Sequence, residues 1–374
     1  MDLRFTEQED AFRREARAWL EANVPHDLPS GDTGEGFGVH LDWERKLFDN
    51  RWAVVSWPFA YGGREASLIE WLIFEEEYYR AGGPQRVTQN GIFLLAPTVF
   101  EFGTEEQRDR ILPRMAAAED LWCQGWSEPN AGSDLAAIKS TARRDESGGG
   151  WRLTGQKTWT TRGAFCTHLF GLFRTDPSAE RHRGMTYFLV PLEAEGVTVR
   201  GFGRLDGDEG FAEVFFEDVF VPDSDVLGDV NKGWNVAMAT TGSERGLTLR
   251  SPGRFMATAA RLVELCMSEP DRSLDAEVVA CWMDAEAYRW QTYATVARLM
   301  DGATAGAEAS LTKLFWSELD VRLHETALRL LGSDAELEGP WMKGFQFALA
   351  GPIYAGTNEI QRNVVAERVL GLPR

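Results

Sequence analysis

The first 120 residues carry the three-to-four-residue hydrophobic spacing that is typical of surface helices in a globular protein. Thr6 and Glu9 form the pattern of a capping box, and the apolar residues after them trace one helical face. Thr104 and Gln107 repeat that pattern further along the chain. The expected helices span residues 6–23, 41–50 and 68–80, with turns rich in Pro and Gly at 58–63 and 82–84. The sequence therefore predicts an N-terminal α-helical domain over residues 1–120.

The pattern then changes to short segments rich in β-branched and aromatic residues, separated by turn clusters. The expected strands span residues 151–161, 167–174, 185–191, 197–200 and 213–221. Segments this short, with turns between them, favour antiparallel pairing. The sequence predicts a small central antiparallel β domain over residues 121–228.

Long helical periodicity returns in residues 229–374. One predicted apolar stripe contains Val278, Trp282, Ala285 and Arg289, and a second contains Leu311, Leu314, Phe315, Leu319 and Leu323. Such stripes face the core of a C-terminal helical bundle. The order of helices, strands and helices predicts an α+β fold without the strand–helix alternation of a Rossmann domain. A nucleotide cofactor would have to be held in another way.

Composition narrows the class of protein. A chain of 374 residues with 44% hydrophobic residues is large enough for two or three packed subdomains. It contains neither an apolar run long enough to span a membrane nor an N-terminal export signal, so we expect a water-soluble, cytoplasmic protein without a membrane span. The net charge of -19 argues against nucleic-acid binding and means that an anionic substrate needs a locally basic entrance.

Metal ligation and disulfides are not expected. The four cysteines form no CxxC pair, and the five histidines show no HxxxH spacing. We interpret the cysteines as small core residues in a reducing compartment. The acidic run Glu75–Glu77 is interpreted as the solvated face of a helix.

Two segments carry candidate chemistry. Residues 126–134, WSEPNAGSD, form a loop rich in hydroxyl groups and backbone donors, and residues 155–161, GQKTWTT, place a Trp beside two Thr on a predicted strand. Together they could offer a flat aromatic surface to a flavin ring and hydroxyls to its heteroatoms. The same residues also fit a turn followed by a core aromatic, and composition does not decide between the two.

These segments and five others, in the same order, make the chain resemble the acyl-CoA dehydrogenase superfamily over essentially its whole length. The other matches are FRTD at 173–176, FAEVFFEDVFVP at 211–222, KGW at 232–234, SER at 243–245, and YAGTNEIQR at 354–362 leading into AERVLGLPR. The resemblance implies the acyl-CoA dehydrogenase fold with a C-terminal four-helix bundle. It also implies FAD bound in an extended pose between the β domain and the bundle.

The resemblance also assigns site residues. Ser127 would bond the pyrimidine side of the flavin, Trp159 would pack on its ring, and Thr161 would address its N5 region. Ser133 would line both the flavin and the thioester entrance. The cofactor set is completed by Trp126 and Thr160 in the same segments, by Gly356, Thr357 and Glu359 on the pyrophosphate and adenosine side, and by Arg329.

The reaction implied by the resemblance removes a proton from the carbon α to a thioester and a hydride from the β carbon. A weakly acidic proton of this kind needs a carboxylate base. Many members use the Glu of a Tyr-Glu-Gly-Thr run, where this chain has Ala355 after Tyr354. Other members place the base directly before an arginine, which matches Glu244 and Arg245. We therefore predict Glu244 as the base, with Ser133, Arg245, Tyr354 and Ala355 on the substrate side; a solvated Glu244 or one paired with Arg245 is the alternative.

Two departures from the family pattern concern the contacts to a neighbouring subunit's FAD. The Arg-x-x-x-Phe-Gly motif has only a loose counterpart at residues 250–255, and Gln-x-x-Gly-Gly appears as residues 329–333, RLLGS, with Arg329 as a substitute anion contact. Completion of the flavin site by a different subunit, as in heteromeric members of the superfamily, is therefore an alternative that the resemblance leaves open.

The function expected from the resemblance is conversion of an acyl-CoA to the trans-2-enoyl thioester, with electrons passed to an electron-transfer flavoprotein. Branched, cyclic, aromatic or steroid-side-chain thioesters are the favoured substrates, and a homo- or heteromeric dimer or tetramer is the favoured assembly. The alternatives are a half-site or non-catalytic subunit, a dehydrogenase for acyl-carrier-protein thioesters, and a flavin oxidase or hydroxylase on the same fold.

Overall fold

The computed structural model describes residues 4–245, 251–303 and 306–373, except for the side chains of residues 243–245. The chain divides into two compact units. The helical unit comprises Met1–Asp27, Glu65–Pro84 and Arg245–Arg374, and the sheet unit comprises Leu28–Arg64 and Gln85–Glu244. Each unit is therefore built from segments that are far apart in the sequence.

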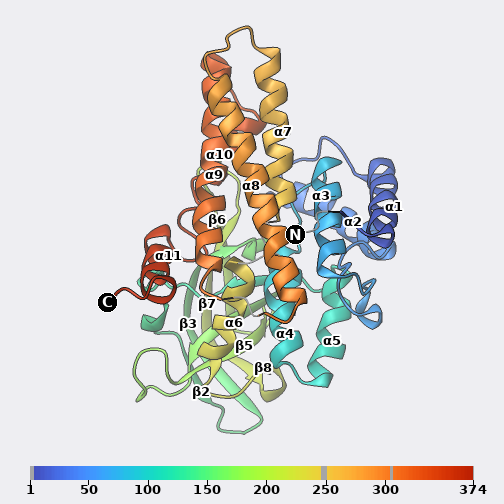
Figure 1. Cartoon of the computed structure of the whole chain (residues 1–374). Helices are drawn as coiled ribbons and strands as arrows, with labels where there is room; N and C mark the ends of the chain where they lie inside the picture. The colour runs from blue at the N-terminus through green and yellow to red at the C-terminus, as the bar shows by residue number, and fades with distance from the viewer. Residues whose placement is uncertain (1–3, 246–250, 304–305, 374) are drawn as a thin grey trace. The chain divides into compact units, whose positions relative to one another are not determined.

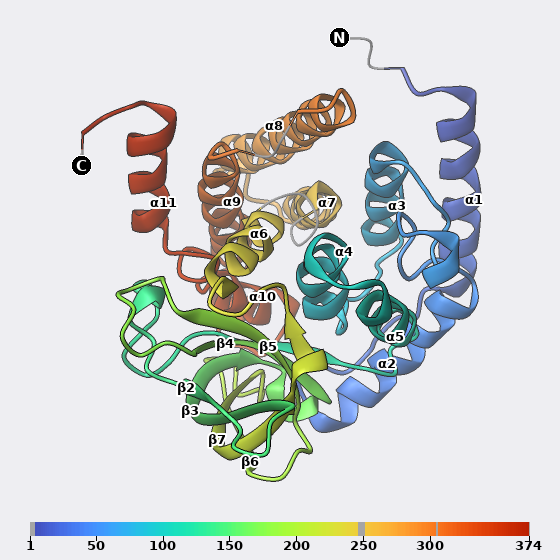
Figure 2. The ribbon, with the colours of Figure 1, turned by 90° about the horizontal axis from the view of Figure 1, so that it is seen from below.

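A curved sheet forms the centre of the sheet unit (Figure 2). Its strands are β1 (Trp122–Gly125), β2 (Thr141–Arg144), β3 (Gly150–Thr161), β4 (His168–Arg174), β5 (Met185–Pro191), β6 (Val197–Phe202), β7 (Phe211–Pro222) and β8 (Val226–Leu227). Neighbours follow the order β6-β7-β3-β2-β4-β5-β8, with β1 beside β4. The pairing is antiparallel, as predicted, except where β1 and β2 each run parallel to β4.

The core of the sheet unit follows from the alternation of its strands. Along β7, Ala212, Val214 and Phe216 are buried while the residues between them are partly exposed. Phe216 meets Phe173 edge to face at a centroid distance of 5.1 Å, and Phe173 meets Phe188 at 5.9 Å. The expected strands match β3, β4, β5, β6 and β7 to within two residues at each end, whereas the short strands β1, β2 and β8 were not predicted. The alternation in β7 reflects burial of one face, while β4 and β5 are buried along almost their whole length.

Helices also belong to the sheet unit. These are α2 (Gly34–Asp49), α4 (Ala96–Phe102), α5 (Glu105–Ala116) and α6 (Gly233–Arg245), with short turns η1 (Phe59–Tyr61), η2 (Asn90–Leu95), η3 (Leu135–Ala137), η4 (Gly163–Phe165) and η5 (Asp223–Asp225). The capping box predicted at Thr104 and Gln107 is present. The helix predicted over residues 41–50 begins earlier, because the Thr33 side chain accepts a hydrogen bond from the Gly36 amide and caps it.

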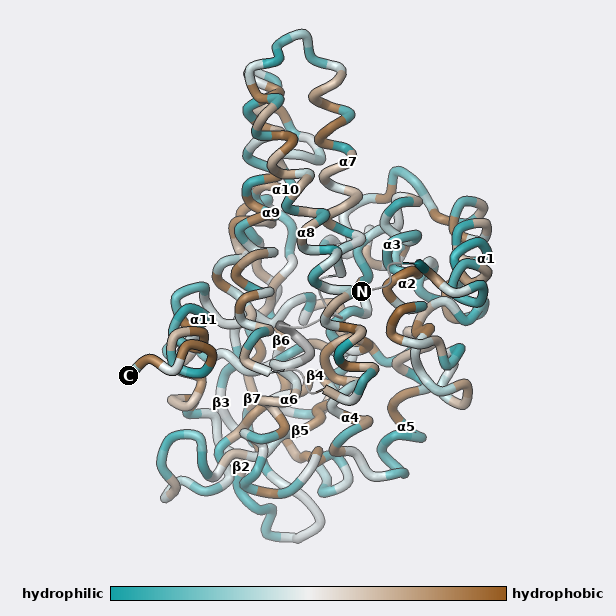
Figure 3. The backbone as a smooth tube through the Cα atoms, in the orientation of Figure 1, coloured by the Kyte–Doolittle hydropathy of each residue, from teal (hydrophilic) through white to brown (hydrophobic). Residues whose placement is uncertain are grey.

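The helical unit consists of helices of very different lengths (Figure 1). They are α1 (Glu7–Asn23), α3 (Leu68–Arg80), α7 (Pro252–Ser268), α8 (Asp275–Met300), α9 (Ala309–Leu331), α10 (Pro340–Ala348) and α11 (Asn358–Val364), with short turns η6 (Gly332–Glu336) and η7 (Val365–Val369). Hydrophobic and hydrophilic positions alternate along α7, α8 and α9 (Figure 3). Phe255, Tyr288 and Trp316 join these three helices in one core. No described helix is both long and apolar enough to cross a membrane.

The predicted apolar stripes of the bundle are only partly right. Val278, Ala285, Leu319 and Leu323 are buried, but Trp282, Leu311 and Phe315 are 44%, 46% and 37% exposed. The buried side of α9 instead includes polar residues, among them Lys313, Asp320 and His324. A search for apolar residues alone misplaces the face of a helix whose core positions are polar.

The prediction of a solvated face at Glu75–Glu77 is wrong. Glu75 and Glu77 are 4% and 1% exposed. Glu77 is surrounded by arginines: Arg17 Nη2 lies 2.8 Å, Arg80 Nε 2.8 Å and Arg13 Nη1 3.0 Å from its carboxylate oxygens. Burial on its own would raise the pKa of Glu77, but these arginines lower that pKa to about 2. The acidic run does not reveal this burial because two of the three arginines, Arg13 and Arg17, lie on another helix, α1.

Glu76 extends this cluster to α8. Its carboxylate receives Arg13 Nη1 at 3.1 Å and Arg289 Nε at 2.6 Å. The side chains of Glu76 and Arg289 are 9% and 20% exposed. The acidic run thus links α1, α3 and α8 within the helical unit.

Candidate functional site

Trp159 stands at an irregular point of β3. The pairing of β3 with β7 shifts register between Lys157 and Thr160, which marks a β-bulge. Trp159 has a left-handed φ of 58°, and 60% of the residue is exposed. Its ring contacts Phe202 and Phe211 edge to face at 5.3 and 5.5 Å. The bulge therefore turns a large aromatic ring outward and two aromatic neighbours support it.

The backbone around this ring is strained. Positive φ is uncommon for a residue with a side chain, and Arg162 also adopts it, with φ 55°. Between them, Thr160 is fully buried and Thr161 half-buried. Such conformations persist where the surroundings enforce them, and they concentrate at functional sites.

The loop before β2 is joined to this bulge. The Thr158 amide donates to the Ser127 carbonyl at 2.9 Å, so the structure brings Ser127 next to Trp159 along the backbone. Trp126 is buried against Phe170 and Tyr187. Ser133, further along the loop, is exposed.

Two buried polar atoms in these segments lack partners. Neither Trp126 Nε1 nor Thr160 Oγ1 forms a hydrogen bond within the described part of the chain. Buried polar groups are normally satisfied. Together with the outward ring of Trp159, these atoms fit a planar cofactor that carries hydrogen-bonding heteroatoms.

A buried ion pair unites the two candidate segments. Lys157 is 0% exposed and donates from Nζ to Glu128 Oε1 at 2.9 Å and to the Leu172 carbonyl at 2.8 Å. The Glu128 carboxylate also accepts from the amides of Lys139 at 2.6 Å and Ser140 at 2.9 Å. Both residues lie within the two candidate segments, but their sequence pattern indicates no role for either. The sequence signal that could have marked the pair is a charged Lys within a predicted strand.

The protein environment lowers the pKa of both members of this pair. Complete burial lowers the pKa of Lys157 to about 8, although Glu128 acts in the opposite direction. Burial opposes ionisation of Glu128 as well, but Lys157 and the amide donors outweigh it and lower the pKa of that carboxyl. Both groups are therefore charged at neutral pH, and the pair anchors the loop to β3.

The predicted pyrophosphate-side residues form a separate turn in the helical unit. Ala355 and Gly356 have left-handed φ values of 57° and 78°. Thr357 follows as the N-cap of α11 and accepts from the Ile360 amide at 3.3 Å. Gln361 Nε2 donates back to the Ala355 carbonyl at 3.0 Å. The turn is closed by side chains of the helix that it begins.

Asn358 and Lys313 support this turn from within the helical unit. Lys313 is 0% exposed, and its Nζ donates to Asn358 Oδ1 at 2.7 Å. The Tyr354 ring stacks on Trp316 with centroids 5.8 Å apart. Glu359 is exposed, and hydrogen bonds from its own amide and from Thr357 lower the pKa of its carboxyl.

The remaining predicted residues are placed as follows. The Arg329 side chain is 52% exposed and forms an ion pair with Glu277 on α8. Glu244 and Arg245 are the last residues of α6, and their side chains lie outside the described part of the structure. The role of Glu244 therefore stays a prediction.

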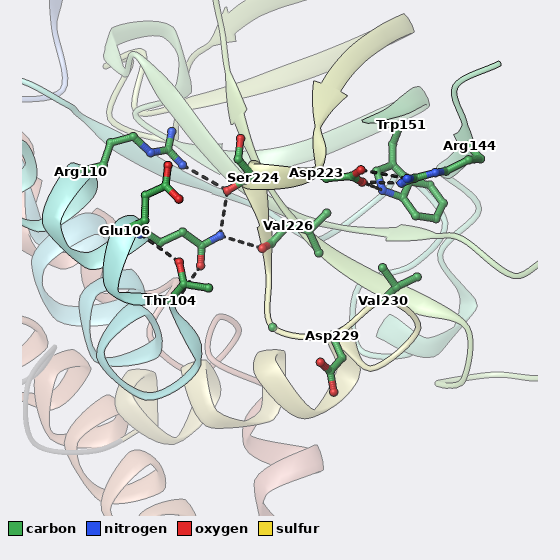
Figure 4. A pocket seen from close by; sticks show the side chains of 12 residues that line it. Thr104, Glu106, Arg110, Arg144, Trp151, Asp223, Ser224, Val226, Asp229 and Val230 are labelled. Atoms are coloured by element: carbon green, nitrogen blue, oxygen red, sulfur yellow. Dashed lines mark hydrogen bonds and ion pairs between the residues drawn. The ribbon is translucent and has the colours of Figure 1, made fainter. Parts of the chain in front are cut away.

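A cavity of about 680 Å³ lies elsewhere in the sheet unit (Figure 4). Arg144 and Asp223 pair beside Trp151 in its wall, and Thr104 and Arg110 of α5 line another part. It contains none of the predicted site residues. Its wall carries charges of both signs, which does not define a ligand.

The chain matches family models along most of its length. Residues 6–119 match the acyl-CoA dehydrogenase N-terminal domain, residues 123–219 the middle domain, and residues 231–370 the C-terminal domain. A similar relative is acyl-CoA dehydrogenase IpdE1 of Mycolicibacterium smegmatis, 38% identical over 97% of both chains.

Solved structures show the same fold. The steroid ACAD Tcur3481-Tcur3483 superposes with a TM-score of 0.88 at 26% identity and covers 100% of both chains. The ChsE4-ChsE5 complex from Mycobacterium tuberculosis gives a TM-score of 0.84 at 28% identity, again over 100% of both chains. The α+β fold expected from the resemblance is thereby confirmed.

Proposed function

The chain belongs to the acyl-CoA dehydrogenase family, and on that premise we propose that it oxidises an acyl-CoA thioester to the trans-2-enoyl-CoA with Glu244 as base. FAD is the cofactor of this family, and when bound it supplies the hydride acceptor. The observation that carries the proposal is the exposed Trp159 ring on a strained bulge, with buried, unpaired polar atoms beside it in the described chain.

Each unit carries residues that the family resemblance assigns to the cofactor. On the sheet unit, Trp126, Ser127, Ser133, Trp159, Thr160 and Thr161 address the flavin. On the helical unit, the Gly356 and Thr357 turn, Glu359 and Arg329 address the pyrophosphate and adenosine. Glycine at 356 suits this role because its left-handed backbone, with φ 78°, leaves room for close approach.

The proton would be removed by Glu244. α6, which carries this residue near its end, is anchored in the sheet unit because Thr240 Oγ1 lies 2.8 Å from Thr98 Oγ1. Thr240 also lies 3.4 Å from the Tyr187 hydroxyl. A rigid helix serves a base well because proton transfer depends on fixed geometry. Because Ala355 stands where many family members have a glutamate, Glu244 is the proposed base.

The substrate is proposed to be a bulky thioester. The supporting relative is the steroid ACAD, whose name favours a steroid-derived acyl group over a simple mid-length chain. We propose an electron-transfer flavoprotein as the acceptor. An assembly with a second, different chain is supported by the ChsE4-ChsE5 complex among the similar solved structures.

The experiment is anaerobic mixing of the yellow protein with a panel of linear, branched, cyclic and steroid-derived acyl-CoAs. Glu244→Gln should retain FAD but slow bleaching of the oxidised-flavin band at least ~100-fold, the scale expected for loss of a positioned base. Glu217→Gln, on the exposed side of β7, is the matched control and should bleach like the parent.

Bleaching of Glu244→Gln within threefold of the parent would remove Glu244 from the mechanism. A parent protein that is colourless alone but yellow when a homologous chain is co-expressed would instead mean that the site is completed by that chain. The two results are separable because the first concerns rate and the second flavin content.

A further inference from the structure

A second buried ion cluster lies directly after the flavin-facing end of β3. Asp32, 5% exposed, accepts from Arg162 Nε at 2.6 Å and from Arg204 Nη1 at 2.6 Å. Asp32 is 130 residues from Arg162 and 172 from Arg204 along the chain. All three residues belong to the sheet unit. One carboxylate therefore joins three segments.

The position of Asp32 is fixed by the turn that leads into α2. Thr33 Oγ1 donates to the Ser30 carbonyl at 2.9 Å and accepts from the Gly36 amide at 3.1 Å. A side chain at Gly36 would overlap the Ser30 carbonyl, so the turn closes only around glycine. Asp32 thus approaches the arginines from a rigid support.

The first arm of the cluster holds strained backbone. Arg162 has φ 55° and follows Thr161 directly. Its amide donates to the Gly210 carbonyl at 2.9 Å, and its Nη1 donates to the Arg86 carbonyl at 3.4 Å. A left-handed residue of this kind is strained and persists only where contacts enforce it. The ion pair with Asp32 is a buried contact of that kind.

The second arm holds the loop that supports Trp159. Arg204 donates from Nη2 to Asp206 at 2.7 Å, within the loop between β6 and β7. Phe202 and Phe211 flank this loop and make the edge contacts to the Trp159 ring. Asp32 therefore restrains both the chain after Thr161 and the aromatic support of Trp159.

The cluster is charged at neutral pH. Burial opposes ionisation of Asp32, but Arg162 and Arg204 outweigh it and lower the pKa of its carboxyl. In Arg204 burial is likewise outweighed by Asp32 and Asp206, and the pKa of the guanidinium is raised. The ion pairs do not depend on small changes of pH.

We propose that Asp32 is a positioning residue for the flavin: through Arg162 and Arg204 it holds the bulge of residues 159–162 in the geometry that receives the isoalloxazine ring. The inference rests on the proposed function for the identity of the ligand. It does not rest on Glu244 or on the acyl group. Asp32 itself touches neither cofactor nor substrate in this assignment.

The test uses the full chain with Asp32→Asn, which keeps the size and removes the charge. In the flavin-free protein, hydrogen exchange of the peptide containing the Arg162 amide should become at least ~10-fold faster. The dissociation constant for FAD should rise at least ~10-fold, equivalent to about 1.4 kcal/mol. Asp225→Asn is the matched control, because Asp225 is also buried in the sheet unit and accepts from Arg110 Nη2 at 2.6 Å, but lies outside the Asp32 cluster; its FAD affinity should stay within threefold of the parent.

Asp32→Asn with parental exchange at Arg162 and parental FAD affinity would overturn the proposal, as would equal losses in both variants. If Asp32→Asn does not accumulate as folded protein, Arg162→Lys replaces it, since lysine keeps the charge but lacks the planar fork. Arg162→Lys should show the same faster exchange and weaker FAD binding, and parental values would again reject the idea. If the parent binds no FAD, the proposed function fails, while exchange at Arg162 still reports on the positioning.

Discussion

The end of β3 and the turn before α11 both contain strained, left-handed backbone, but different kinds of contact hold it in place. Each places a non-glycine residue in the left-handed region within a segment expected to meet the cofactor: Trp159 and Arg162 in the sheet unit, Ala355 in the helical unit. At β3, buried ion pairs stand on both sides, Lys157 with Glu128 and Asp32 with Arg162. Charged contacts therefore enclose the strained strand.

The turn before α11 relies mainly on neutral amides. Gln361 donates to the Ala355 carbonyl at 3.0 Å, and the buried Lys313 donates to the amide oxygen of Asn358 at 2.7 Å. One of the two left-handed positions of this turn is occupied by Gly356, which adopts that conformation without steric strain. A bulky aromatic on a bulge needs stronger restraint than an alanine beside a glycine. The comparison predicts that β3 is sensitive to loss of charge and the turn is tolerant.

The largest expected effect is loss of the buried lysine of β3. Lys157→Met should lower the free energy of unfolding by about 3–5 kcal/mol, because removing one partner leaves the Glu128 carboxylate buried without its counter-ion. Denaturant unfolding of parent and variant measures the change. Arg143→Met is the control: the Arg143 and Asp218 side chains are 58% and 56% exposed, and its loss should change stability by less than ~1 kcal/mol.

A Lys157→Met protein as stable as the Arg143→Met control would break the comparison, because the β3 ion pair would then not restrain the strand. If Lys157→Met weakens FAD binding but leaves the free energy of unfolding unchanged, the Lys157–Glu128 pair matters only in the FAD-bound protein.

The sequence predicted local elements well because local pattern causes them. The helix over residues 68–80 and the strand over residues 185–191 have the predicted bounds, since their signals, helical periodicity and a β-rich run bounded by turns, lie in or next to each segment. Glu77 was misjudged for the opposite reason: two of its arginines lie 64 and 60 residues earlier, on α1. Burial of a charge is decided by residues that its own segment does not contain.

The same limit applies to the site. Trp159 was singled out because the segment around it resembles a family motif, whereas no local signal marks Asp32 in a turn near the N-terminus. Its partners became visible only when folding brought residues 130 and 172 positions away to it. Motifs predict residues that face a ligand, and supporting charges depend on the tertiary structure.

A smaller effect distinguishes the two regions by pH. The folded-state pKa of Asp32 is lowered, so its carboxylate contributes stability that is full above its unfolded pKa of about 3.9 and is lost as pH falls through the folded value. Asp32→Asn lacks this contribution at every pH. The stability difference between parent and variant should therefore be about 2 kcal/mol at pH ~6 and shrink below pH ~4.

Asn358→Ala provides the contrast from the turn. An amide does not titrate in this range, so the stability difference between parent and Asn358→Ala should stay constant while that of Asp32→Asn shrinks. Denaturant unfolding across the pH series measures both. A parallel decline of the two differences would mean that acid acts on the whole chain and not on the ion pair of β3.

The smallest effect tests whether the turn stores strain at all. Ala355→Gly should raise the free energy of unfolding by about 0.5 kcal/mol, because relief of a left-handed alanine, worth about 1–2 kcal/mol, is partly offset by the greater freedom of glycine in the unfolded chain. Ala327→Gly, within the buried part of α9, is the matched control and should lower stability by about 1 kcal/mol. The same substitution thus has opposite signs in left-handed and helical backbone. If Ala355→Gly also destabilises the protein, the contacts of Gln361 and Asn358 must favour the alanine, and the turn would be as strictly determined as the bulge of β3.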